Sequence, residues 1–169
     1  MNCGGNEVRS GVRSPGSGVG SLKRMATIRR VEDIQAWQKA RALVREIYKS
    51  CAVGSLARDF GLRDQIRRAA VSSMSNVAEG FARKSDKEFA HYLDMARGSA
   101  IEVQSLLYVA HDVNYIDRHE FERLNGLADE AASLIGGLTS YLRGRAAKKE
   151  SGIRSPVSEK RSSDPAPRT

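Results

Sequence analysis

The 169-residue chain has a formal net charge of +8, with 40% hydrophobic and only 6% aromatic residues. This length is typical of one domain, and no apolar run reaches the roughly 18 residues of a membrane span, which excludes an integral membrane protein. Residues 1–30 contain no continuous apolar secretory segment, and two cysteines are too few for a disulfide framework, so we expect a cytoplasmic protein.

The positive charge is concentrated at the two ends of the sequence. Residues 1–30 carry a net charge of +5 and residues 144–169 a net charge of +4, whereas residues 31–143 sum to −1. Both ends are rich in small and basic residues and poor in apolar ones, so we expect both to be disordered. Patterned sequence begins only after Met25, which makes Met25 an alternative translation start. Basic tails bind polyanions weakly and without specificity, so the tails by themselves favour no particular ligand.

The first predicted helix spans residues 32–51, where Ile34, Trp37, Val44 and Tyr48 recur at spacings of three, four or seven. A glycine-containing link leads to a second helix over residues 62–79. Its inward face is built mainly of small residues, which allow neighbouring backbones to approach closely. Gly80 is predicted to lie just past the end of this helix, because glycine tolerates the positive φ of a helix C-terminus.

Two further helices begin at predicted N-terminal caps. Ser85 and Glu88 form a capping box, and the third helix continues from there to about residue 113. Asp117 caps the fourth helix, which we expect to end near Gly144. The pair at 136–137 is Gly-Gly, which costs roughly 2 kcal/mol of helix propensity and therefore predicts close packing or a bend.

Four amphipathic helices with short links predict an all-α fold, an antiparallel up-down four-helix bundle over residues 31–143. Four apolar residues lie off the apolar stripe of the third helix and exceed what a four-helix core requires: Tyr92, Met95, Ile101 and Tyr108. We therefore expect a second buried surface, and hence self-association. Residues 31–100 carry a net charge of +3 and residues 101–143 a net charge of −4, which favours pairing within or between subunits.

The sequence has no recognisable active site. Glu88 and His91 form one Glu-x-x-His motif, but a di-iron centre needs a second, and neither His111 nor His119 has a carboxylate three residues before it. No glycine-rich loop follows a strand, and no nucleophile lies in a strand-turn-helix context. We therefore expect no enzymatic activity, no metal and no cofactor; a metal-dependent enzyme is the least favoured hypothesis.

Basic residues in and after the second helix form the candidate nucleic-acid-binding site. Arg63 and Arg67 are four residues apart and project together, so they can bridge neighbouring phosphates. The alternative is a solvated face in which Asp59 pairs with Arg63, and Asp64 with Arg68. The full candidate set is Arg63, Arg67, Arg68, Arg83, Lys84, Lys87 and Arg97.

A polar motif precedes the glycine that follows the second helix. Asn76 and Glu79 lie just before Gly80 on a helix of small residues. We interpret these three as a structural motif, because polar groups inside bundles are usually hydrogen-bonded anchors. A contact with a partner is the alternative interpretation.

Three segments together resemble the four-helix-bundle proteins encoded in 23S rRNA intervening sequences of bacteria: QIRRAA at 65–70, SNVAEG at 75–80 and EF at 88–89. The resemblance covers residues 31–143 and implies an up-down bundle that assembles into a ring-like homopentamer. It implies no biochemical activity. The related accessory proteins of diversity-generating retroelements bind nucleic acid through a basic surface and partner a reverse transcriptase, which by analogy favours Arg67, Arg68, Arg83 and Lys84 for such a surface.

Two functional hypotheses follow. The first is a non-enzymatic homo-oligomeric bundle that binds RNA or DNA through its basic surface. The alternative is an assembly scaffold or adaptor whose partner is another protein, for example a reverse transcriptase by family analogy.

Overall fold

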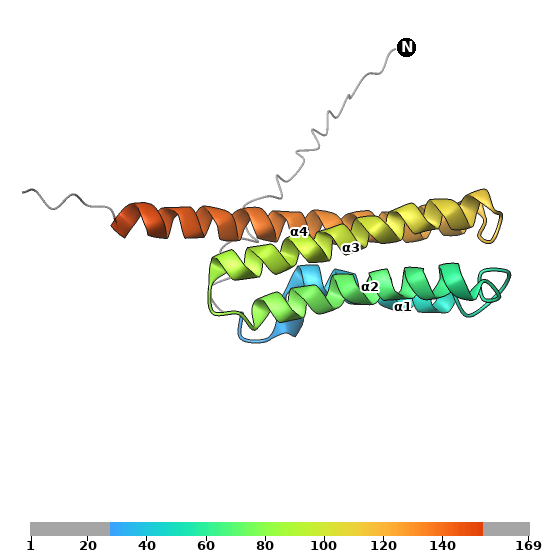
Figure 1. Cartoon of the computed structure of the whole chain (residues 1–169), viewed down its shortest axis with the longest axis horizontal. Coiled ribbons are helices and arrows are strands. Elements are labelled where there is room, and N and C mark those ends of the chain that lie inside the picture. The colour runs from blue at the N-terminus through green and yellow to red at the C-terminus, as the bar shows by residue number, and fades with distance from the viewer. Residues whose placement is uncertain (1–27, 154–169) are drawn as a thin grey trace, which may run out of the picture.

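The computed structural model describes residues 28–153, which fold into four α-helices and no strand. After a single 3-10 turn (η2, Val31–Asp33) come α1 (Gln35–Ser50), α2 (Phe60–Phe81), α3 (Asp86–Asp112) and α4 (Arg118–Ile153). The helices lie side by side, with the α1–α2 and α3–α4 links at one end and the α2–α3 turn at the other (Figure 1). Within residues 28–153, no helix is both long and apolar enough to cross a membrane.

Side-chain caps begin three of the four helices. The Ser85 Oγ accepts a hydrogen bond from the Glu88 amide at 3.1 Å and donates to the Glu88 carboxylate at 2.7 Å. Asp117 accepts from the amide of Glu120 at 2.8 Å, so Ser85 and Asp117 cap their helices as predicted. The capping box is incomplete, because the Glu88 carboxylate accepts from the Ser85 hydroxyl and not from a backbone amide. Asp59 caps α2 in the same way, by accepting from the amide three residues later at 3.0 Å. These bonds satisfy amides that have no partner inside the helix.

The prediction that Gly80 lies past the end of the second helix with a positive φ is wrong. Gly80 is buried inside α2, which continues to Phe81. A Cβ at this position would lie 2.5 Å from Cδ2 of Phe89 and 2.9 Å from Cβ of Tyr92. The missing side chain therefore lets the start of α3 pack directly on the last turn of α2. The positive φ angles occur in the two links at the other end, at Gly54 and Asn114.

The prediction that residues 144–169 form a disordered tail is wrong for residues 144–153, because α4 continues to Ile153. A single glycine costs about 1 kcal/mol and does not end a helix by itself, and Ala, Lys and Glu residues that favour helix follow Gly144. Arg145 also pairs with Asp86 at the start of α3, at 3.2 Å. Residues 28–30, expected to be disordered, are ordered as well. The expectations for residues 1–27, including a start at Met25, and for residues 154–169 lie outside the described residues.

The apolar interior consists of two clusters along the bundle. The cluster at the end with the two links includes Leu43, Ile66, Leu107 and Leu124 from the four helices, all fully buried. The cluster at the α2–α3 turn contains Val77, Leu93 and Ile135, together with residues of the first helix. These residues face one another across the interior. The stripe predicted for the first helix is wrong in part: Trp37 and Val44 are only half-buried and Tyr48 is 45% exposed, whereas α1 buries Ala36, Ala40, Leu43 and Ile47.

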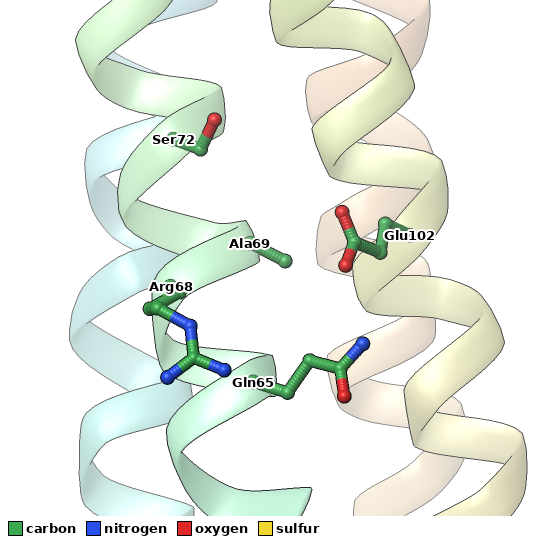
Figure 2. Close-up of a pocket in the computed structure, with 5 residues that line it drawn as sticks. All are labelled: Gln65, Arg68, Ala69, Ser72 and Glu102. Carbon is green, nitrogen blue, oxygen red and sulfur yellow. The ribbon is translucent and has the colours of Figure 1, made fainter.

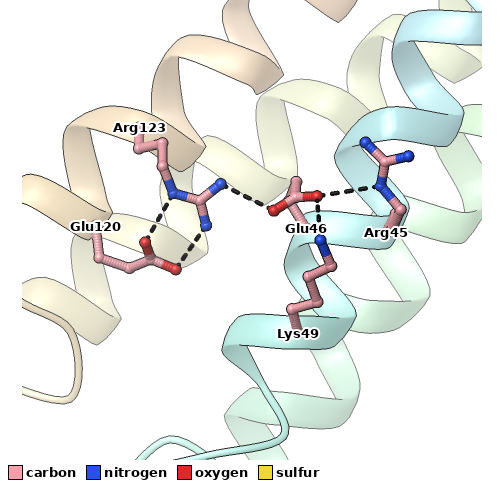
Figure 3. A network of polar contacts seen from close by, with 5 residues as sticks. All are labelled: Arg45, Glu46, Lys49, Glu120 and Arg123. Atoms are coloured by element: carbon pink, nitrogen blue, oxygen red, sulfur yellow. Dashed lines mark hydrogen bonds and ion pairs between the residues drawn. The ribbon is translucent and has the colours of Figure 1, made fainter.

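Glu46 of α1 is the centre of an ion-pair network that joins α1 to α4 (Figure 3). It accepts a hydrogen bond from Arg123 of α4 at 3.0 Å, and from Arg45 and Lys49 of its own helix at 3.1 and 2.9 Å. Arg123 also donates two bonds to Glu120, each at 2.9 Å. Lys49 and Arg45, with a smaller contribution from Arg123, hold the pKa of Glu46 down to about 2.

Replacing Gly80 tests the close approach of α2 and α3. We expect Gly80→Ala to lower the free energy of unfolding by about 1–3 kcal/mol, because the new methyl group meets Phe89 and Tyr92. The matched control is Gly137→Ala, where nothing lies within 4 Å of an added Cβ. That variant should gain roughly 0.5–1 kcal/mol from helix propensity. Urea unfolding followed by circular dichroism measures both, and equal stabilisation at the two sites would contradict the close packing.

The lowered pKa of Glu46 makes the stability depend on pH. Ionised Glu46 stabilises the fold above the usual carboxyl pKa of 4.5, and this contribution is lost as the pH falls towards a folded-state pKa of about 2. Glu46→Gln should therefore lower the Tm at neutral pH, and its difference from the wild type should shrink between about pH 4.5 and pH 2. Thermal melts across this range measure the difference. Glu122→Gln removes an exposed single ion pair and should change the Tm little. A Tm difference between Glu46→Gln and the wild type that stays constant down to pH 2 would refute the lowered pKa of Glu46.

Candidate nucleic-acid interface

The seven basic candidates do not form one patch, because the structure places them on separate parts of the bundle. Arg68 is exposed and lines a groove between α2 and α3 (Figure 2). Arg63 and Arg67 lie on the flank of α2 that faces α1, and both are half-buried. Arg83 and its two lysine neighbours lie at the opposite end of α2, sixteen residues further along, or roughly 24 Å of helix rise. Arg97 lies on α3. Regular spacing predicts which residues share one helix face, but it does not predict which neighbours cover that face.

Arg67 holds the end of α1 rather than facing solvent. Its Nη2 donates to the carbonyl oxygen of Cys51 at 3.0 Å, and its guanidinium lies 4.9 Å from the centre of the Tyr48 ring. A positive charge at this place offsets the partial negative charge of the carbonyls that end α1. Burial raises the pKa of the Cys51 thiol, although the nearby Arg67 acts in the opposite direction. Arg67 therefore already donates a hydrogen bond within the chain, which leaves less of its guanidinium group available to a ligand.

Arg63 is also engaged within the chain, and the expected i,i+4 ion pairs are wrong. Its Nε donates to Asp64 at 2.9 Å and its Nη1 to the carbonyl oxygen of Ala57 at 3.1 Å. Asp59 caps α2, so its carboxylate is directed at a backbone amide instead of at Arg63. Asp64 pairs with Arg63, its neighbour in the chain, and no carboxylate within residues 28–153 pairs with Arg68.

The α2–α3 turn carries the most accessible basic candidates. Arg83, Lys84 and Lys87 are exposed, and none of the three forms an ion pair with a carboxylate in the described part of the chain. Arg83 donates to the hydroxyl of Tyr92, and its guanidinium lies 4.6 Å from the centre of that ring. The ring therefore holds one arginine at the turn while the two lysines extend into solvent.

The C-terminal part of α4 adds charge near the same turn. In Figure 1 this part of α4 projects beyond the other helices, at the end of the bundle where α2 meets α3. It carries Lys148 and Lys149, which are exposed, and Arg145, which pairs with Asp86 at the start of α3. Sequence analysis missed this contribution because it ended the helix at Gly144.

Arg97 lies on the flank of α3 that faces α4. A Cβ on Gly136 would lie 3.5 Å from the Arg97 Nε, which is an ordinary van der Waals distance, and nothing lies within 4 Å of a Cβ on Gly137. The close packing predicted from the Gly-Gly pair is therefore wrong, because a side chain would fit at both positions. Arg97 is therefore not joined to the basic residues of α2.

The polar motif at the end of α2 joins that helix to α3. The Asn76 side-chain amide donates to the Ser72 carbonyl oxygen at 2.9 Å and to its hydroxyl at 3.1 Å. The Ser72 and Ser99 hydroxyls are 2.9 Å apart, and Ser99 donates to the carbonyl oxygen of Met95. Asn76 is buried and takes part in this chain of bonds, whereas Glu79 is exposed. Ser72 and Ser99 escaped sequence analysis because their contact is 27 residues apart in the chain.

The structure also locates the residues of the Glu-x-x-His motif. Glu88 accepts the hydroxyl bond of Ser85 in the helix cap, and the exposed His91 lies beside the ring of Tyr92. Within residues 28–153, no three His, Cys, Asp or Glu side chains come together in a way that could hold a metal ion.

Comparison with known proteins places the four helices in a family. A protein of unknown function from the S23 ribosomal protein family of Bacteroides thetaiotaomicron has a crystal structure similar to this one, with a TM-score of 0.57. The two chains are 23% identical over 62% of this chain and 97% of the other, which establishes the likeness of fold alone. No curated protein matches the sequence. Residues 32–137, more than half of the chain, match the model of the 23S rRNA-intervening sequence proteins, so the protein belongs to that family.

Proposed function

We propose that this protein is a non-enzymatic, homo-oligomeric, antiparallel up-down bundle that binds RNA or DNA through a basic surface at the α2–α3 turn. The observation that carries this proposal is the exposure of Arg83, Lys84 and Lys87 with no ion-pair partner among residues 28–153. Because none of the three is held in an ion pair, their cationic groups are available to contact phosphates.

Eight basic side chains on the four helices form ion pairs, so a nearby carboxylate offsets the charge of each. Arg41, Arg68 and Arg97 form no ion pair within residues 28–153, but they lie apart from the turn. The ion-paired residues on the four helices are Lys39, Arg45, Lys49, Arg63, Arg118, Arg123, Arg143 and Arg145. The proposed surface therefore depends on basic side chains that are not engaged in ion pairs and not on the net charge of the chain.

Phosphate contacts made by lysine and arginine hold a nucleic acid without reading its bases. The projecting end of α4 extends the surface through Lys148 and Lys149. In the ring-like homopentamer that the family resemblance implies, each copy contributes one such surface and their fields add. Exposed Met95, Ile101 and Tyr108, each at least 44% accessible, support self-association.

Reversing charge at the turn tests this site against bulk electrostatics. Arg83→Glu/Lys84→Glu in the full chain should weaken RNA binding at least roughly tenfold and reduce the salt slope by about two, because two phosphate contacts are lost. The control, Arg58→Glu/Arg118→Glu, changes the net charge equally at the opposite end and should retain most of the affinity. Fluorescence anisotropy across a salt series measures both. Equal losses in the two variants would refute the site, and unchanged binding in both would refute the role of this surface.

A protein-binding scaffold is the second candidate function, and the α1–α2 link favours it. Val53 in the link is 68% exposed and Phe60, the first residue of α2, is 67% exposed, which is unusual for large apolar side chains. If this is the function, the wild-type protein should retain a defined protein at fixed stoichiometry after nuclease treatment, and Phe60→Ser should release it. Mass spectrometry of the purified complex measures this. Recovery of nucleic acid alone would count against the scaffold.

A further inference from the structure

The α2–α3 turn presents aromatic rings as well as positive charge. His91 lies near the start of α3 with its side chain exposed, and the centre of its ring lies 6.0 Å from that of Tyr92. Lys87 precedes His91 by four residues, so the two side chains share one face of the helix. An exposed ring therefore lies beside the basic residues of the proposed surface.

The packing of α3 against α2 explains why these groups meet. Gly80 leaves room for Tyr92, whose Cβ would lie 2.9 Å from a Cβ on the glycine. Arg83 follows Gly80 by three residues, which brings it within reach of the same tyrosine. Its guanidinium donates to the Tyr92 hydroxyl and lies 4.6 Å from the centre of the ring. Tyr92 therefore fixes the position of Arg83 while the arginine stays exposed.

Two other arginines of α2 lie on aromatic rings, but both are used within the chain. Arg63 lies 4.6 Å from the centre of the Phe60 ring, and it also donates to a carbonyl oxygen of the α1–α2 link. Arg67 lies 4.9 Å from the centre of the Tyr48 ring, and it donates to the carbonyl oxygen that ends α1. Within residues 28–153, Arg83 donates to no carbonyl oxygen. More of its planar group is therefore accessible to a ligand.

Charge by itself gives this turn only a modest hold on phosphates. Glu79, Asp86 and Glu88 lie within or beside it, although Asp86 pairs with Arg145 and Glu88 accepts the Ser85 hydroxyl. Stacking on a ring or a guanidinium does not depend on net charge, and every base has a flat face to offer. A ligand that adds stacking to its phosphate contacts therefore suits this turn better than one that offers phosphates alone.

We propose that the α2–α3 turn binds an unpaired nucleic-acid strand, whose bases stack on the His91 ring and the Arg83 guanidinium while its phosphates contact Lys84 and Lys87. This inference rests on the proposed function and specifies the form of its ligand. In a duplex the bases are stacked on one another, so a ring on a protein surface does not reach their faces. In an unpaired strand the bases can turn outward and stack on aromatic or arginine side chains.

Strands with and without bases test the stacking in the full chain. The probes are oligothymidine, an abasic strand of equal length, and the oligothymidine annealed to its complement. His91→Ala removes the ring, and Arg83→Lys keeps the charge but removes the planar group. Each variant should weaken the binding of oligothymidine at least roughly fivefold more than the binding of the abasic strand or the duplex. Fluorescence anisotropy at one fixed salt concentration measures all three affinities.

Two control variants match these changes. His119→Ala makes the same substitution at an exposed histidine at the other end of the bundle, and it should leave all three affinities unchanged (Figure 1). His91→Phe keeps a ring at the site and should retain the affinity for oligothymidine. Helical circular dichroism equal to that of the wild type shows that each variant is folded.

The outcomes separate this inference from the proposed function. A loss in either variant that is larger for oligothymidine than for the other two probes supports base stacking at the turn. Losses that are equal for the three probes, or no loss in either variant, overturn base stacking and leave phosphate binding at the turn standing. A wild-type protein that binds none of the three probes overturns both.

Discussion

The close approach of α2 to α3 is the constraint on which the rest of the bundle depends. Gly80 has no side chain where the rings of α3 pack, and the hydroxyls of Ser72 and Ser99 meet across the two helices. Because the helices touch through small groups, larger side chains near the contact must point outward. This places Arg68 and Glu102 on the outer walls of a groove, and it brings the basic α2–α3 turn to one end of the bundle.

The electrostatics of the protein follow from where its carboxylates lie. Glu46 offsets three basic groups at once, and Asp94 and Asp86 hold the arginines of α4 against α3. A nearly neutral bundle therefore has a few places where charge is not offset. The turn with Lys84 and the groove with Arg68 are two such places, and they differ in chemistry. At the turn, three basic side chains have no ion-pair partner in the described residues, which suits phosphates, whereas the groove carries the opposite charges of Arg68 and Glu102.

The sequence by itself determined the four helices, their caps at Ser85 and Asp117 and the family, because spacing and capping are local properties. It misplaced the ends at Gly80 and Gly144, since packing decides whether a glycine ends a helix. Adjacent Arg67 and Arg68 show what only the tertiary structure decided. Both are arginines on one helix, yet one is held by a carbonyl oxygen sixteen residues earlier and the other lines an open groove. The spacing of residues determines which face of a helix a side chain lies on, and only the tertiary structure determines which groups that side chain contacts.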